Sequence, residues 1–164
     1  MRKFVCASLL LSIATIAGCD PDGGSALVRI ENDFDNTTFS FNPPWTICES
    51  SYLGHDFGRI AYGAISEEQE IEPGLDHVLM VAAWNDPSCA PENSLPIASR
   101  EEEEVVSGQQ RTISINLPNH QGACPPEGTA PIPESLYNRI LQKWPSYGFK
   151  PYAERTENAQ CLAD

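Results

Sequence analysis

The stretch Val78-Leu79-Met80-Val81-Ala82-Ala83 is apolar at every position. It lies between the turn residues Pro73-Gly74 and a segment, residues 85–94, that is rich in Pro, Asn and Asp. A strand with apolar side chains on both faces is typical of the middle of a sheet that is covered on both sides. The sequence therefore predicts a central strand within residues 75–84, with other strands around it.

Shorter segments on both sides of this run alternate between apolar and polar residues. Such alternation predicts strands with one buried face. The expected inward-facing sets are Val28 and Ile30, Phe39 and Phe41, Trp45 and Ile47, Ile60 and Tyr62, and Ile113, Ile115 and Leu117. A further strand is expected at residues 95–100. Roughly six to eight short strands, with no long helical pattern before residue 133, predict a mainly β protein with an antiparallel β-sandwich over residues 26–118.

The last part of the chain, residues 119–164, has a different composition. Residues 118–133 hold five prolines and Cys124, which predicts an extended strap across the sandwich. Pro133 and Glu134 suit the first turn of a helix. The apolar residues that follow recur at helical spacing, and they are Leu136, Tyr137, Ile140, Leu141 and Trp144. We expect one amphipathic helix of about three turns that packs on the sandwich.

The first residues have the pattern of an export signal. A basic start, Met1-Arg2-Lys3, precedes a mostly apolar run over residues 5–17, which is shorter than the ~20 residues of a membrane-spanning helix. The run ends in Ile16-Ala17-Gly18-Cys19, which resembles the lipobox of bacterial lipoproteins. An uncleaved N-terminal helix is the alternative, but it leaves the small residues before Cys19 unexplained.

The lipoprotein resemblance implies cleavage between Gly18 and Cys19 and attachment of lipid to the Cys19 thiol. Residues 1–18 are then the signal peptide and residues 19–25 a lipidated tether. The expected location is the exported side of the inner or outer membrane of a bacterium. In enteric bacteria an aspartate at the position of Asp20 marks retention in the inner membrane, but sorting rules differ between lineages, so both membranes stay open.

The mature chain has a strongly acidic balance. The full sequence holds 10 basic and 23 acidic residues, and the leader contains Arg2 and Lys3 but no acid. Eight basic residues against 23 acidic ones give a formal net charge of −15. Such a surface repels nucleic-acid phosphates and anionic lipid, so we expect no nucleic-acid partner and a membrane contact made through the lipid on Cys19.

A weaker resemblance concerns the turn before the apolar run. Ile71-Glu72-Pro73-Gly74 followed by Leu75-Asp76-His77 is similar to a Pro-Gly hairpin of transthyretin-like sandwiches, although the tyrosine that usually follows is missing. The resemblance implies a sandwich topology and no particular ligand.

No known catalytic or metal-binding motif occurs in the chain. Gly-x-Ser-x-Gly, His-Glu-x-x-His, a phosphate-binding Gly-rich loop and Cys-x-x-Cys are all missing. The three histidines, His55, His77 and His120, lack metal-ligand spacing and are interpreted as ordinary surface or hydrogen-bonded residues. The acidic run at residues 101–104 predicts an exposed strand edge rather than a cation site. We therefore predict no catalytic residue, metal or cofactor, although a triad of distant residues has no sequence signature.

Four cysteines remain once Cys6 leaves with the leader and Cys19 is acylated. Cys48, Cys89, Cys124 and Cys161 are then expected to form two disulfides in an oxidising compartment. Four cysteines allow three pairings. We favour Cys48 with Cys89 and Cys124 with Cys161, because the second bond would tie the tail to itself around the helix.

Two functions from different classes are compatible with these patterns. The first is a lipid-anchored, non-catalytic envelope lipoprotein that has a structural role or binds an envelope protein or a glycan. The alternative is a periplasmic hydrolase or ligand carrier whose site is assembled from residues distant in sequence. A pocket in which a histidine meets a carboxylate and a serine would favour the second.

Overall fold

The apolar run forms the middle strand of the largest of three sheets in the described part of the chain. The computed structural model describes residues 24–34, 45–116, 120–122 and 131–154. Its five-stranded sheet has the order β10-β7-β6-β2-β3, and β6 (Leu79–Trp84) is antiparallel to both of its neighbours. The other members are β2 (Trp45–Tyr52), β3 (His55–Asp56), β7 (Ser94–Ser99) and β10 (His120–Gly122). The prediction of a central strand is confirmed.

Both faces of β6 are buried, but against different partners. Successive side chains in a strand point to opposite faces of the sheet. Met80 and Ala82 lie in a core between the two sheets, whereas Leu79, Val81 and Ala83 lie in a second core beneath the helix. Burial on both faces explains why the strand is apolar at every position.

The three-stranded sheet has β1 (Ala26–Asn32) at its centre, in the order β4-β1-β9. β1 is antiparallel to β4 (Gln69–Ile71) and parallel to β9 (Gln110–Ile115). The inward residues Val28, Ile30, Ile113 and Ile115 are buried, as their alternation predicts. The mainly β, sandwich-like fold is confirmed, and the parallel β1–β9 pair is a departure from a purely antiparallel sandwich.

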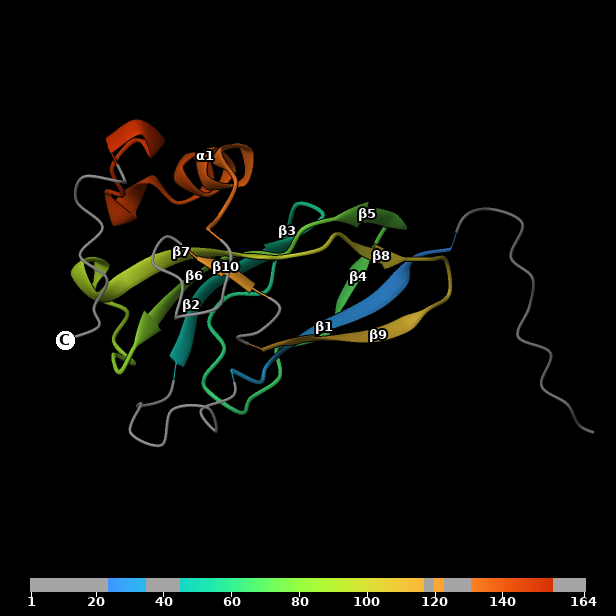
Figure 1. Ribbon diagram of the computed structural model, residues 1–164. Coiled ribbons are helices and arrows are strands. Elements are labelled where there is room, and N and C mark those ends of the chain that lie inside the picture. Colours follow the sequence, from blue (N-terminus) through green and yellow to red (C-terminus); the bar gives the residue numbers. More distant parts are fainter. Residues whose placement is uncertain (1–23, 35–44, 117–119, 123–130, 155–164) are drawn as a thin grey trace, which may run out of the picture.

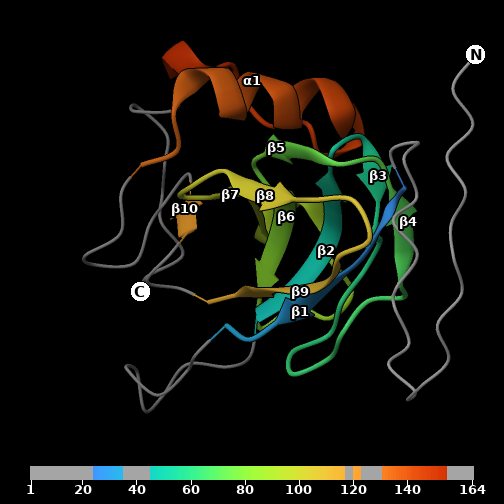
Figure 2. The ribbon, with the colours of Figure 1, turned by 90° about the vertical axis from the view of Figure 1, so that its right-hand side faces the viewer.

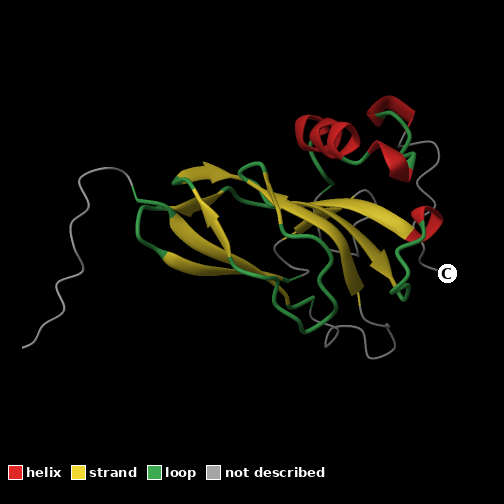
Figure 3. Cartoon of the chain, turned by 180° about the vertical axis from the view of Figure 1, so that it is seen from behind, coloured by secondary structure: helices red, strands yellow, loops and turns green. Residues whose placement is uncertain are grey.

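A helix covers the outer face of the larger sheet, so the molecule has a helix layer above two sheet layers (Figures 1 and 3). α1 (Glu134–Lys143) buries Leu136, Tyr137 and Ile140, while Leu141 and Trp144 are partly buried in the same core. The predicted amphipathic helix is confirmed. Figure 2 shows α1 lying across the strands of this sheet.

In the described ranges, three short 3-10 helices accompany these elements. They are η1 (Pro91–Asn93), η3 (Pro145–Tyr147) and η4 (Tyr152–Glu154). Pro145 follows the end of α1 and opens η3. The residues expected to form a strap contribute β10, which pairs with β7, and Gly122 also forms an isolated bridge with Pro131.

Two of the expected strands are wrong in detail. The segment over residues 75–84 is split: β5 (Gly74–Asp76) pairs with β8 (Glu103–Val105) in a separate two-stranded sheet, and β6 starts at Leu79. At the split, side chains rather than the backbone of a neighbouring strand accept hydrogen bonds from the backbone N–H groups. Asp76 Oδ1 accepts from the His77 N–H at 2.8 Å, and Ser99 Oγ accepts from the Val78 N–H at 2.9 Å.

The other error concerns Ile60 and Tyr62. Ile60 makes only an isolated bridge with Ile47 and is buried, whereas Tyr62 is 45 % exposed, so the two side chains do not share a buried strand face. The strand expected around Phe39 and Phe41 lies outside the described residues.

Candidate functional site

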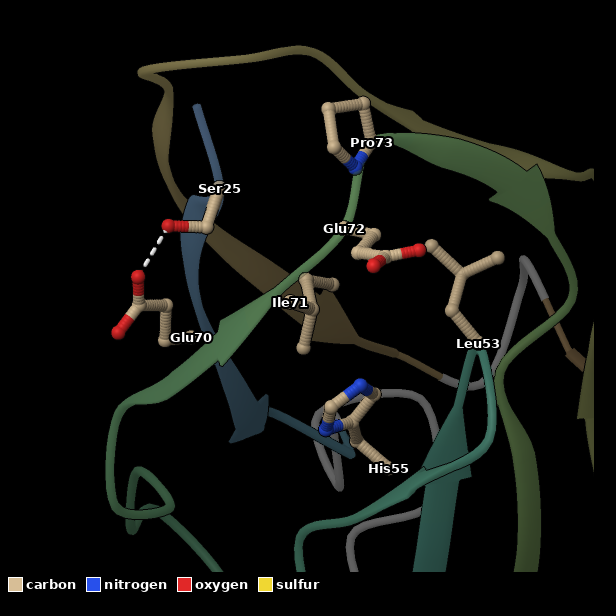
Figure 4. A pocket seen from close by; sticks show the side chains of 7 residues that line it. All are labelled: Ser25, Leu53, His55, Glu70, Ile71, Glu72 and Pro73. Atoms are coloured by element: carbon tan, nitrogen blue, oxygen red, sulfur yellow. Dashed lines mark hydrogen bonds between the residues drawn. The ribbon is translucent and has the colours of Figure 1, made fainter. Parts of the chain in front are cut away.

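A pocket of about 450 Å³ opens at one end of the sandwich (Figure 4). Its seven lining residues come from the edge strands of both sheets and from their connections: Ser25, Leu53, His55, Glu70, Ile71, Glu72 and Pro73. β3 is the edge of the five-stranded sheet and β4 is the edge of the three-stranded one. Because these two edges belong to different sheets, the pocket lies where the layers separate.

Part of the pocket lining is apolar and packs against the core. Ile71 is 1 % exposed and Leu53 packs against the core between the sheets. Leu53 lies in the left-handed region, with φ of 48°, next to Gly54 in the turn between β2 and β3. A Cβ added to Gly74 would lie 2.9 Å from Leu53 Cδ2, so glycine is needed there for the Leu53 side chain to keep its place.

The polar lining is acidic. The hydroxyl of Ser25 donates a hydrogen bond to the Glu70 carboxylate. Glu70 and Glu72 are exposed and His55 is half-buried. No lysine or arginine is among the lining residues. The pocket therefore combines an apolar floor with two negative charges.

The serine, the histidine and a carboxylate line the same pocket but do not form a relay. In the described part of the chain, no hydrogen bond joins His55 to Ser25, Glu70 or Glu72. Figure 4 shows Ser25 facing Glu70, with His55 apart from this pair. Nucleophilic catalysis by serine requires a base within hydrogen-bond reach of the hydroxyl, normally a histidine that an acid orients. In this arrangement, His55 makes no hydrogen bond to the Ser25 hydroxyl within the described residues.

The histidines are spread over the molecule. His77 Nδ1 lies 3.0 Å from the Ser99 carbonyl oxygen, where the split between β5 and β6 occurs. His55 lines the pocket. His120 is part of β10, and its side chain lies outside the described residues. Among the described residues, no three His, Cys, Asp or Glu side chains are placed to hold a metal ion together.

One of the two expected disulfides is present. Cys48 in β2 is bonded to Cys89 in the loop before η1, as predicted. Cys124 and Cys161 lie outside the described residues, so the second disulfide stays a prediction. Gly18 and Cys19 also lie outside them, and so do the cleavage and lipidation expected there.

The loop that carries Cys89 is organised by one carboxylate. Asp86 accepts hydrogen bonds from the Ser88 hydroxyl and N–H, the Ala90 N–H and the Asn93 amide. These bonds, with those from Ser88 and Asn93 foremost, hold the pKa of Asp86 well below its usual range. The ordered loop presents Cys89, whose φ is 62°, to Cys48.

The acidic run ends in a paired strand. Glu103 and Glu104 belong to β8, where Arg111 forms an ion pair with the Glu103 carboxylate and donates to the Glu104 carbonyl oxygen. Glu101 and Glu102 are exposed. Because Arg111 comes from β9, this ion pair connects the small two-stranded sheet to the three-stranded one.

No helix in the described ranges is long and apolar enough to cross a membrane. The chain matches no protein-family model, and neither a curated protein nor a solved structure matches it significantly. Within the described residues, the pocket is the candidate binding site.

The sequence did not single out the pocket residues. The sequence places Ser25 in the tether and predicts an ordinary surface or hydrogen-bonded histidine at His55. The signal in the sequence is Glu70-Ile71-Glu72, in which two carboxylates flank the apolar residue that ends β4, beside a Pro-Gly turn. Alternation places both carboxylates on one side of the strand, but only the fold shows that a second sheet edge faces them.

Proposed function

We propose that this chain is an exported, lipid-anchored envelope protein without catalytic activity, which binds a partner in the pocket close to the membrane surface. Its location is supported by the lipobox-like Ile16-Ala17-Gly18-Cys19 and by the apolar leader before it. The second disulfide, between Cys124 and Cys161, is part of the same proposal, because export places these thiols in an oxidising compartment.

The observation that carries the proposal is that Ser25, the last residue of the expected tether, lines the pocket. Residues 20–25 reach at most roughly 20 Å when fully extended. A lipid on Cys19 would therefore keep the pocket within about that distance of the membrane. Figure 1 shows that β1 begins at the same end of the molecule as β4, β5 and β8.

The anchor is tested by replacing the expected lipid acceptor. Cys19→Ser should abolish incorporation of labelled fatty acid and processing by the lipoprotein peptidase, and it should release the protein from the membrane fraction. Cys6→Ser is the matched control, because Cys6 lies in the leader and should leave both processing and labelling unchanged. Labelling of Cys19→Ser at the level of the parent would refute the anchor.

A hydrolase is the second candidate, because Ser25, His55 and Glu70 line one pocket. A rearrangement that brings His55 to the Ser25 hydroxyl would be required. A fluorophosphonate probe tests this directly. Covalent labelling that Ser25→Ala abolishes would support the hydrolase and contradict the non-catalytic proposal.

A further inference from the structure

We infer that the pocket binds a basic side chain, lysine or arginine, of a partner protein. This inference names a ligand for the pocket on which the proposed function rests. It does not depend on the lipid, so it can fail while the anchor is verified, and the reverse is also true.

The first argument is the unbalanced charge of the pocket. Glu70 and Glu72 contribute two carboxylates, and the only hydrogen bond that the described residues make to either of them comes from the neutral Ser25 hydroxyl. The basic side chains that form ion pairs in the described ranges are bound elsewhere: Arg29 to Glu68, Arg111 to Glu103, Arg139 to Asp76 and Lys143 to Asp56. The pocket therefore has room for a cation supplied by a partner.

The second argument is the apolar surface next to these carboxylates. Leu53 and Pro73 line the same hollow, and the Ile71 side chain, which is almost completely buried, belongs to the core next to it. Lysine and arginine bury their methylene stems along apolar surface while the charged head makes polar contacts. A volume of about 450 Å³ lies within the usual range of small-ligand pockets, so a single basic side chain fits.

Two other cations fit less well. A hard divalent ion requires six or more converging oxygens, and His55, Glu70 and Glu72 are not placed to ligate one ion together. An amine-bearing phospholipid headgroup carries a phosphate beside its amine, which the pocket carboxylates and the surrounding negative charge would repel. A protein side chain avoids both difficulties.

The test uses the full-length lipidated protein in detergent micelles, with methyl-labelled isoleucine observed by NMR. The probes are blocked tripeptides with a central arginine or lysine, and the control peptide carries citrulline, which has nearly the shape of arginine without its charge. Basic peptides should shift the Ile71 methyl signal in a saturable way and leave the Ile140 signal, beneath α1, unchanged. The citrulline peptide should produce no saturable shift.

Variants then assign the binding to the carboxylates. Glu70→Gln and Glu72→Gln should each raise the dissociation constant by about threefold, the range expected of solvent-accessible ion pairs, and the double variant by about tenfold. Glu92→Gln, an exposed glutamate in η1, is the matched control and should leave the constant unchanged. Added salt should weaken binding to the parent more than to the double variant.

Several outcomes would overturn the inference. They are equal binding of the citrulline peptide, no shift at millimolar peptide, and unchanged affinity of the double variant. Vesicles of phosphatidylethanolamine form the last arm: if they shift the Ile71 signal and the basic peptides do not, the ligand is a lipid amine. If the parent protein incorporates no labelled fatty acid but still binds the basic peptides, the anchor alone is refuted.

Discussion

At the scale of single residues, Asn32 is a polar side chain in the interior of the protein. It is fully buried, yet its side chain is polar. Its amide nitrogen donates to the carbonyl oxygens of Trp45 at 3.0 Å and Ile60 at 2.9 Å, and its side-chain oxygen accepts from the Phe34 N–H at 3.4 Å. One side chain thus binds a backbone group two residues along the chain and one in each of two segments that are distant in sequence.

Replacing Asn32 with leucine should therefore lower the free energy of unfolding by about 2–3 kcal/mol, because the carbonyl oxygens of Trp45 and Ile60 lose the Asn32 amide as a donor and Ile60 keeps the Ile47 N–H. Asn32→Asp should cost at least as much, since a carboxylate oxygen would then face those carbonyls. Urea unfolding of the full chain measures both changes. Asn138→Leu, on the half-buried flank of α1, is the control and should change stability by about 0.5 kcal/mol or less. A similarly small effect of Asn32→Leu would contradict the assigned role.

Tyr52 connects the large sheet to β8. Its side chain is 1 % exposed, and the phenol donates a hydrogen bond of 2.6 Å to the Glu103 carbonyl oxygen. Burial, opposed by the nearby Arg111 charge, raises the pKa of Tyr52 to about 12. A raised pKa means that folding favours the protonated phenol.

The stability contribution of this phenol should be complete below pH 10 and should be lost as the pH rises towards 12. At neutral pH, Tyr52→Phe should be less stable than the parent by about 1 kcal/mol. Between pH 10 and 12 the difference in free energy of unfolding between the parent and Tyr52→Phe should shrink and then change sign, because only the parent must bury a phenolate. Unfolding measured across the range shows the change. A gap that stays constant would argue against the buried phenol, and Tyr62→Phe at the exposed Tyr62 should have no effect.

At the scale of elements, a bulge and a disulfide position the loop after β6. The register of β2 against β6 shifts between Ile47 and Glu49. Ile47 lies in the core between the sheets, whereas Cys48 faces the core beneath α1, where it meets Cys89. The bond ties β2 to a loop 41 residues later in the chain.

Removing this bond with Cys48→Ala and Cys89→Ala should lower the free energy of unfolding by about 3–4 kcal/mol in the chain-entropy description. Urea unfolding of the double variant against the oxidised parent measures the difference. Cys6→Ser serves as the control, since that thiol should be lost with the leader. A loss below about 1 kcal/mol would show that the loop is held mainly by the Asp86 hydrogen bonds.

The helix is attached to the sheets by polar as well as apolar contacts. Arg139 donates to both carboxylate oxygens of Asp76 in β5, at 2.9 and 2.6 Å. Burial opposes ionisation of Asp76, but the Arg139 hydrogen bonds and the His77 N–H outweigh it and leave the pKa below its usual value. This ion pair joins α1 to β5.

At the scale of the whole molecule, two cores meet across one five-stranded sheet. The core between the sheets and the core beneath α1 share the alternating faces of β6. Among the residues that the structure describes, the members of both cores lie between Ala26 and Tyr152. Folding should therefore require neither the leader nor the lipid.

A shortened chain that begins at Gly24 and is exported to an oxidising compartment should remain in solution and should give a far-UV circular dichroism spectrum dominated by β-structure. It should unfold in one cooperative transition, as single domains of this size usually do. The full chain with Cys19→Ser is the reference and should have the same unfolding midpoint. A mainly helical spectrum or a gradual transition would contradict the layered fold.

Local periodicity predicted several features of the fold correctly. These features are the apolar run of β6, the alternation in β1 and β9 and the helical spacing of Leu136, Tyr137 and Ile140. Each pattern shows which side chains the segment buries, because side chains return to the same face every 2.0 residues in a strand and every 3.6 residues in a helix. The Cys48–Cys89 pairing is also confirmed; it was favoured because the other two cysteines would tie the tail to itself.

Only the tertiary structure decided which distant segments meet. The parallel pairing of β1 with β9 and the split between β5 and β6 follow from strand neighbours, which a repeat within one segment does not encode. The pocket arises in the same way, because Ser25, His55 and Glu70 lie far apart in sequence and share a surface only where two sheet edges separate. Sequence patterns therefore determined what each segment buries, and the packing of the sheets determined the candidate binding site.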